Sequence, residues 1–131
     1  MAHDENTPTR LDPRVALAGG DNRWRTGVRG VRCTACGYPA ADPFPRCPLC
    51  GAEMCDAVFG PTGTVWSSTV IRVPIPGRTP PYGVAYVDLD DGPRITVHTG
   101  ADTAQAVPVG TRVRITGTNA TGDVEVEAVS E

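Results

Sequence analysis

The 131-residue sequence contains no lysine, and all twelve of its basic residues are arginines. A Schiff base between a carbonyl substrate and a lysine amine is therefore excluded on this chain. Aromatic residues make up only 5% of the sequence, whereas glycine (15 residues) and proline (13 residues) are abundant. This composition favours short strands joined by many turns over long helices.

Long apolar runs and an excess of positive charge are missing as well. No stretch approaches the roughly 18 apolar residues that a membrane-spanning helix requires, so we expect no membrane partner. Residues 1–10 are polar and contain no apolar core, which predicts a disordered tail rather than a signal peptide. We therefore expect a cytoplasmic protein. The net charge of −3 provides no global field that would attract nucleic acid.

Four of the five cysteines form two C-x-x-C pairs, with the spacing Cys33-x2-Cys36-x10-Cys47-x2-Cys50. In a reducing compartment, such pairs are better read as metal ligands than as disulfides. A glycine follows each pair, which allows the backbone to turn back and point amide groups at the sulfurs. The pattern predicts a structural zinc ribbon over residues 33–57, without an open coordination position. Rubredoxin-like iron, buried free thiols and disulfides remain alternatives, because spacing alone does not choose the metal.

The remaining nucleophiles do not form a catalytic pattern, and we predict no catalytic residue. Cys55 has no partner cysteine and no neighbouring base, so we interpret it as a small residue packed beside the ribbon. Ser67 and Ser68 are not embedded in a nucleophile-elbow motif. His98 lies in an alternating strand pattern that predicts a solvated face.

Residues 11–32 are predicted to form a short helix and a basic connector. Asp12 as N-cap and Pro13 at the first helical position favour a helix that extends to Leu17. The connector is either a solvated basic stretch or an anion site, since guanidinium groups suit phosphates and carboxylates. Coenzyme A or an acidic patch on a partner would fit its arginines, which are Arg23, Arg25, Arg29 and Arg32.

From residue 58 onward, the pattern changes to β. The proline-rich segment 74–81 cannot be a central strand, and residues 102–107 have room for one helical turn. Five strands with an interruption after the third predict a five-stranded OB-fold barrel over residues 58–131, in a mainly β protein. The strands are expected at 64–73, 82–89, 94–99, 111–116 and 123–129.

The last two strands are predicted to form a hairpin that turns near Asn119-Ala120. This register would place Arg112 opposite Glu127 and Arg114 opposite Glu125. Such cross-strand ion pairs are structural, and each would contribute about 0.2–1 kcal/mol.

Several motifs in this order resemble the acyl-CoA-associated zinc-ribbon/OB-fold family, the domain of unknown function thirty-five. The resemblance covers about residues 11–129, although the N-terminal region holds only one aromatic residue, Trp24. The matching elements are Arg32-Cys33-x-x-Cys36-Gly37, Pro45-Arg46-Cys47-Pro48-x-Cys50-Gly51, Gly63-x-Val65, Pro80-Pro81-Tyr82 and Val87-Asp88-Leu89-Asp90-x-Gly92-Pro93-Arg94.

The resemblance implies a non-catalytic accessory subunit rather than an enzyme. Its partner would be a thiolase- or ketosynthase-like enzyme, or a hotdog-fold hydratase, which it would assist in handling acyl-CoA or acyl-transfer substrates. A separate thiolase-like or ketosynthase-like partner is the first choice. We expect the contacts with this partner, or with CoA, at Arg29, Arg32 and Tyr82.

The alternative hypothesis is a single-stranded nucleic-acid-binding protein, because zinc ribbons and OB-folds can both serve that role. Such proteins need stacking aromatic rings on a positive groove. Residues 57–131 contain five arginines against eight acidic residues, which disfavours this hypothesis.

Overall fold

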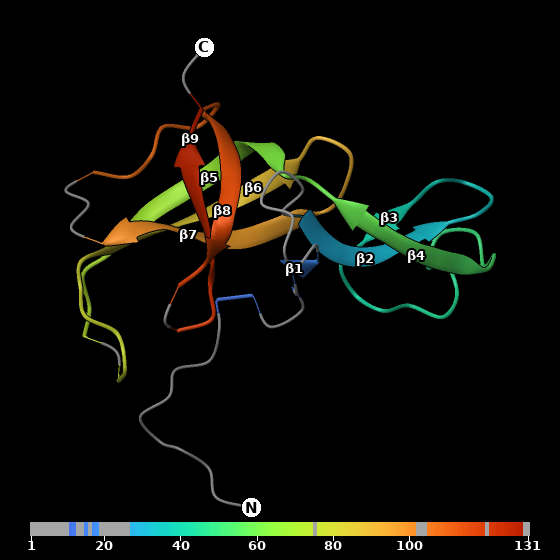
Figure 1. The fold of residues 1–131 in the computed structure, drawn as a ribbon, viewed down its shortest axis with the longest axis horizontal. Helices are drawn as coiled ribbons and strands as arrows, with labels where there is room; N and C mark the ends of the chain where they lie inside the picture. Colours follow the sequence, from blue (N-terminus) through green and yellow to red (C-terminus); the bar gives the residue numbers. More distant parts are fainter. Residues whose placement is uncertain are drawn as a thin grey trace, which may run out of the picture.

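The computed structural model describes residues 11–12, 15, 17–18, 27–74, 76–101, 105–119 and 121–129. These residues form nine strands in two bodies, a four-stranded sheet and a closed barrel (Figure 1). Within the described chain no helix is long and apolar enough to cross a membrane. The strands are β1 (Leu17–Ala18), β2 (Gly27–Cys33), β3 (Pro39–Ala40), β4 (Met54–Phe59), β5 (Thr62–Ile71), β6 (Tyr82–Leu89), β7 (Arg94–Ala101), β8 (Arg112–Thr118) and β9 (Val124–Ala128).

The four-stranded sheet is built around β2. Strand β4 pairs along one edge of β2, from Val28 opposite Phe59 to Cys33 opposite Met54. The short strands β1 and β3 pair with β2 at its other edge. Strand β2 is continuous from Gly27 to Cys33, so the predicted boundary between connector and ribbon at residue 32 falls inside it.

The barrel has the strand order β5-β6-β7-β9-β8, with β8 returning to pair with β5. This order is that of an OB-fold, and the predicted fold class is confirmed in this respect. Strand β6 has the predicted bounds, and the other four differ from the prediction by a few residues at their ends. The barrel's buried core is aliphatic and includes Val65, Val87, Ile95, Val97 and Val113.

The helix predicted from Asp12 to Leu17 is not confirmed. Leu17 lies in β1, and the Asp12 carboxylate accepts a hydrogen bond from the backbone amide of Thr96 (3.1 Å) instead of capping a helix. Val15 is 2% exposed and joins the barrel core. Tertiary contacts thus outweigh the local helix signals. Residues 13, 14 and 16 lie outside the described residues, as do Arg23, Trp24 and Arg25.

This N-terminal segment completes the barrel where its strand pairing is sparse. Strands β7 and β9 are parallel and meet at a single register position, His98 opposite Glu125. Beside that position, Asp12 binds the backbone of β7, and the Leu11 amide donates to Asp123 Oδ1 (2.8 Å) just before β9. The segment then pairs with β2 through β1, so it connects the barrel to the four-stranded sheet.

Phe59 joins the two bodies at the end of β4. Its ring is fully buried in the core cluster, and the Arg32 guanidinium lies 5.1 Å from the ring centroid. The turn between β6 and β7 fits against the same ring, because a Cβ on Gly92 would approach Phe59 to 2.5 Å. Arg32 also donates to the carbonyl oxygen of Asp91 (2.5 Å) in this turn. The ribbon and the barrel therefore share a packed contact.

The predicted register of the last hairpin is wrong. Strands β8 and β9 pair with Arg114 opposite Glu127, and Arg112 binds Asp90 instead. The turn is centred near Thr121 rather than between residues 119 and 120, because the Asn119 side chain accepts hydrogen bonds from the backbone amides of Thr121 and Asp123 (both 3.0 Å). Such Asx-type bonds lengthen the turn and shift the register.

The helical turn predicted over residues 102–107 lies partly outside the described residues. Its described part, residues 105–107, is not helical.

Candidate metal centre and polar network

The four clustered cysteines lie at the end of the ribbon that is distant from the barrel. Two backbone turns with the same hydrogen-bond pattern hold them, Cys33 and Cys36 in the first and Cys47 and Cys50 in the second. In the first turn the Cys33 amide donates to the Tyr38 carbonyl oxygen (2.9 Å), and in the second the Cys47 amide donates to the Ala52 carbonyl oxygen (2.9 Å). The glycine after each pair has a positive φ, 80° at Gly37 and 79° at Gly51. A positive φ favours glycine, which explains its place after both pairs.

The four sulfur atoms converge on one point. All lie within 4.8 Å of one another, with 3.5 Å between Cys33 and Cys50 and 3.7 Å between Cys36 and Cys47. A tetrahedral Zn²⁺ with sulfurs about 2.3 Å away requires sulfur–sulfur separations of about 3.8 Å. The donor set therefore fits a tetrahedral ion that prefers thiolates, and all four positions are filled by protein ligands.

The surroundings lower the pKa of two of these thiols, Cys33 and Cys47, and raise the pKa of the other two. The amides of Cys36 and Ala35 donate to Cys33 Sγ (both 3.3 Å) and lower the pKa of this thiol to about 6. At Cys36, the Tyr38 amide acts to lower the pKa, but the neighbouring Cys33 thiol helps to raise it to about 12. Four thiolates this close need a cation among them, which is the chemistry of a structural metal site.

Cys55 lies on β4, apart from the metal cluster. Its thiol donates a hydrogen bond to the Arg32 carbonyl oxygen (3.3 Å). Cys55 is exposed, so it is not the packed residue beside the ribbon that we predict from the sequence.

The three predicted partner contacts occupy different surroundings. Arg29 is exposed on β2 and lines a cleft of about 540 Å³ with Asp56 and Val58. Arg32 is committed to internal contacts: besides Asp91, it binds the Gly37 carbonyl oxygen (2.9 Å). Tyr82 is only 3% exposed, so its ring is part of the barrel wall. Arg29 is thus the member of this set that the structure leaves at the surface, and the role of all three stays a prediction.

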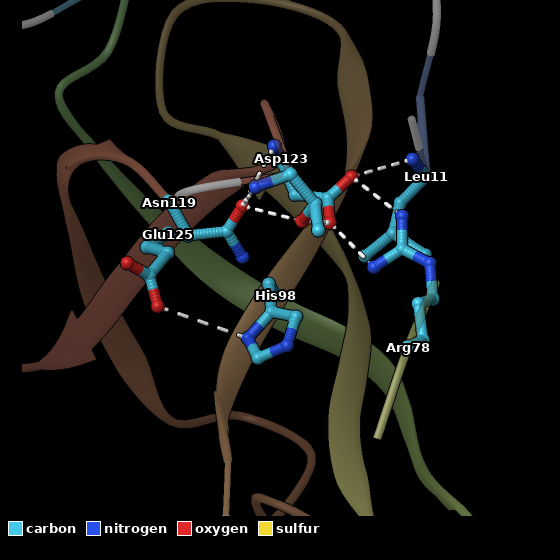
Figure 2. A network of polar contacts seen from close by, with 7 residues as sticks. Leu11, Arg78, His98, Asn119, Asp123 and Glu125 are labelled. Carbon is cyan, nitrogen blue, oxygen red and sulfur yellow. Dashed lines mark hydrogen bonds and ion pairs between the residues drawn. The ribbon is translucent and has the colours of Figure 1, made fainter. Parts of the chain in front are cut away.

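A polar network that the sequence did not reveal lies where the proline-rich loop meets the β8–β9 turn. The Asp123 carboxylate is 0% exposed and holds the Arg78 guanidinium by two hydrogen bonds of 2.6 and 3.0 Å (Figure 2). It also accepts hydrogen bonds from Thr121 Oγ1 and from the Leu11 amide. Burial acts to raise the pKa of Asp123, but the Arg78 hydrogen bonds and the other donors outweigh it and lower the pKa.

His98 borders this network and is not solvated as predicted. It does share a strand face with Thr96 and Arg94, but it is only 8% exposed, and the Tyr82 ring stacks on the imidazole with the ring centroids 5.6 Å apart. Glu125 Oε2 lies 3.8 Å from His98 Nδ1 (Figure 2). A cleft of about 330 Å³ lies here, lined by Arg78, Tyr82, His98, Asn119 and Glu125 among others.

The structure does not bring a serine to His98. Ser67 and Ser68 line a different cleft, and Ser68 Oγ donates to the Val107 carbonyl oxygen. Within the described chain, the candidate nucleophile and base are therefore not paired.

The fold and the metal-binding cluster together define a zinc-ribbon/OB-fold protein. Residues 57–118 match the family model described as ChsH2, C-terminal OB-fold domain. A chain of the solved Ltp2-ChsH2(DUF35) aldolase is similar over 78% of this chain and 84% of its own length, with 25% identity and a TM-score of 0.65. The probable enoyl-CoA hydratase alpha subunit of Thermomonospora curvata is 34% identical over 101 residues.

Together, these matches support the acyl-CoA-associated DUF35/ChsH2 family for this chain, as its motifs predict. The match covers 72% of this chain but only 32% of the hydratase subunit, so the chain spans about a third of the length of that relative.

Proposed function

We propose that this chain is a non-catalytic accessory subunit, with a structural zinc ion, that binds an acyl-CoA-processing enzyme. The observation that carries the proposal is its similarity, over most of both chains, to a chain of an aldolase assembly whose name joins a DUF35 protein to Ltp2. The hydratase alpha subunit of Thermomonospora curvata supports the same chemistry, since it is named as one subunit of an enzyme that acts on an enoyl-CoA.

The composition of the metal cluster supports the non-catalytic part of this proposal. Four protein thiolates complete a tetrahedral site, so the ion would hold the ribbon together and would not bind substrate. We propose zinc rather than iron, and the cytoplasm as the compartment, where thiols stay reduced.

For the partner, we propose a thiolase-superfamily or ketosynthase-like enzyme, with a hydratase as the second choice. Arg29 is the proposed contact with this enzyme or with a phosphate of CoA, because an exposed guanidinium suits both. Charge reversal by Arg29→Glu is expected to weaken the complex, with Arg114→Glu on the barrel as a control at another exposed arginine.

The test is purification of the tagged chain from its native cell, followed by mass spectrometry and metal analysis. We expect an acyl-CoA-processing enzyme at near-equal molar amount and about one zinc per chain. Recovery of the chain without such an enzyme, even after chemical cross-linking in the cell, would reject the accessory role. Iron in place of zinc would correct the metal without affecting the role.

A further inference from the structure

Two of the barrel's aromatic side chains lie on its outer face rather than in its core. Trp66 on β5 is 52% exposed and Tyr86 on β6 is 49% exposed. Arg94 on the neighbouring strand β7 is exposed beside them. These three residues form what we call the aromatic patch. Trp, Tyr and Arg are the residue types that dominate binding energy at protein interfaces.

The patch is held in a fixed arrangement. The Trp66 and Tyr86 rings lie 6.2 Å apart with a tilt of 56°, and the Arg94 guanidinium stacks 3.8 Å from the centroid of the Trp66 ring. Asp88 fixes the same guanidinium through hydrogen bonds to Nε (2.6 Å) and Nη2 (3.2 Å). Because these side chains are already ordered, a partner would lose little conformational entropy by ordering them.

Trp66 lies at a β-bulge, and its outward position continues the alternation of buried and more exposed residues along β5. The pairing of β5 with β6 shifts register between Val65 and Ser67, so Trp66 is the extra residue of the bulge. Val65 on one side of it is 1% exposed in the core, whereas Trp66 points to solvent. Bulges are common next to active sites.

A shallow cleft continues the patch along the same face. It has a volume of about 270 Å³, and Ile71, Val84 and Tyr86 give it an apolar wall. The remainder is lined by Ser67, Ser68, Thr69 and Ala85. A cleft of this size and polarity can take one aliphatic or aromatic side chain of a partner.

The charge around the patch selects the kind of partner. Asp88, next to the patch, neutralises the charge of Arg94, and residues 57–131 hold fewer arginines than acidic residues. A single-stranded nucleic acid needs a positive groove as well as stacking rings. An uncharged, apolar protein segment needs only the rings and the cleft.

We propose that the aromatic patch docks an uncharged, apolar segment of the partner enzyme, with one apolar side chain of that segment in the cleft beside Tyr86. The inference rests on the accessory role proposed above and adds the surface that would carry it. Docking would bury the exposed half of the Trp66 ring.

The experiment uses the full chain labelled with 5-fluorotryptophan and the unlabelled enzyme identified by co-purification. The chain contains two tryptophans, so the ¹⁹F signals of Trp24 and Trp66 are assigned with a Trp24→Phe variant. We expect the Trp66 signal to shift or broaden when the enzyme is added, and to stay unchanged with single-stranded oligothymidylate. Trp66→Ala should weaken enzyme binding about 30-fold or more.

Matched controls separate this inference from the accessory role. Val109→Ala and Leu49→Ala remove side chains that are 70% and 72% exposed outside the patch, and they should change affinity less than twofold. If the enzyme binds but the Trp66 signal and the affinity of Trp66→Ala are unchanged, the docking surface is wrong while the accessory role stands. A Trp66 shift with the oligonucleotide would instead identify a nucleic-acid site. If no acyl-CoA-processing enzyme binds the parent chain, both proposals fail.

Discussion

The ribbon and the barrel bury different kinds of side chain. At the distal end of the ribbon, the buried residues are the ligands Cys33 and Cys47 and the small residues Ala40 and Ala41. The barrel instead buries a cluster of valines, isoleucines and leucine, for each of which burial contributes about 1.5–3 kcal/mol. We therefore expect the ribbon to depend on a metal ion at its four cysteines, whereas the barrel depends on its apolar core, and Phe59 couples the two.

The first and largest test of this difference is removal of a metal ligand. Cys36→Ser should abolish metal binding and unfold the ribbon, because metal binding supplies about 10–16 kcal/mol in comparable small modules. Hydrogen exchange should show loss of protection in β2 and β4, while β6 and β7 stay protected. Cys55→Ser is the control and should retain a full complement of metal. A metal-free chain with unchanged protection in β2 and β4 would contradict this interpretation.

Truncation of the coupling residue should have the next largest effect. Phe59→Ala is expected to lower the free energy of unfolding by about 3–5 kcal/mol, because it removes a fully buried ring that fits against Gly92 and Arg32. Urea unfolding followed by circular dichroism measures the change. Val58→Ala, at the neighbouring position with 56% exposure, should change stability by less than about 0.5 kcal/mol. Equal effects of the two substitutions would argue against a coupled contact.

The buried ion pair tests the barrel alone. Asp123→Asn should destabilise the barrel by about 3 kcal/mol, since it leaves the Arg78 charge buried without its carboxylate. The pH dependence follows from the lowered pKa of Asp123: its contribution is present above about pH 4, the range of an unfolded aspartate, and is lost as pH falls through the lower folded pKa. Thermal unfolding between pH 2 and pH 6 should therefore show a smaller acid loss in the variant than in the parent. Parallel curves would mean that the pair does not contribute.

The smallest effect is expected at the surface of the barrel. Arg112 lowers the pKa of Asp90 to about 2, but both side chains are exposed by more than a third, so Asp90→Asn should cost no more than about 1 kcal/mol. Added salt should reduce the difference between parent and variant, as measured by their melting temperatures. A cost of several kcal/mol would show that this pair acts like the buried one.

Local patterns predicted much of the chain correctly. The C-x-x-C spacing identified the four clustered cysteines, because two residues of one tight turn are enough to define half of a metal site. Strand β6 was predicted at its observed bounds, since the alternation of buried and more exposed residues from Gly83 to Leu89 is regular. The helix predicted from Asp12 is not confirmed, and the predicted register of the last hairpin was wrong. Contacts with a distant strand at Asp12, and a side chain in the hairpin turn, outweighed the local signals.

By itself, the sequence determined the clustered cysteines, the mainly β class and the order of the barrel strands, because these depend on spacing and periodicity along the chain. Only the tertiary structure decided which polar side chains form hydrogen bonds within the protein and which remain exposed to solvent. Asp12 meets Thr96 across 84 positions, and Arg32 meets Asp91 across 59. No local pattern encodes such pairs, since they arise only when distant parts of the chain pack together. The contacts of Trp66 with Tyr86 and Arg94 likewise exist only once β5, β6 and β7 are paired.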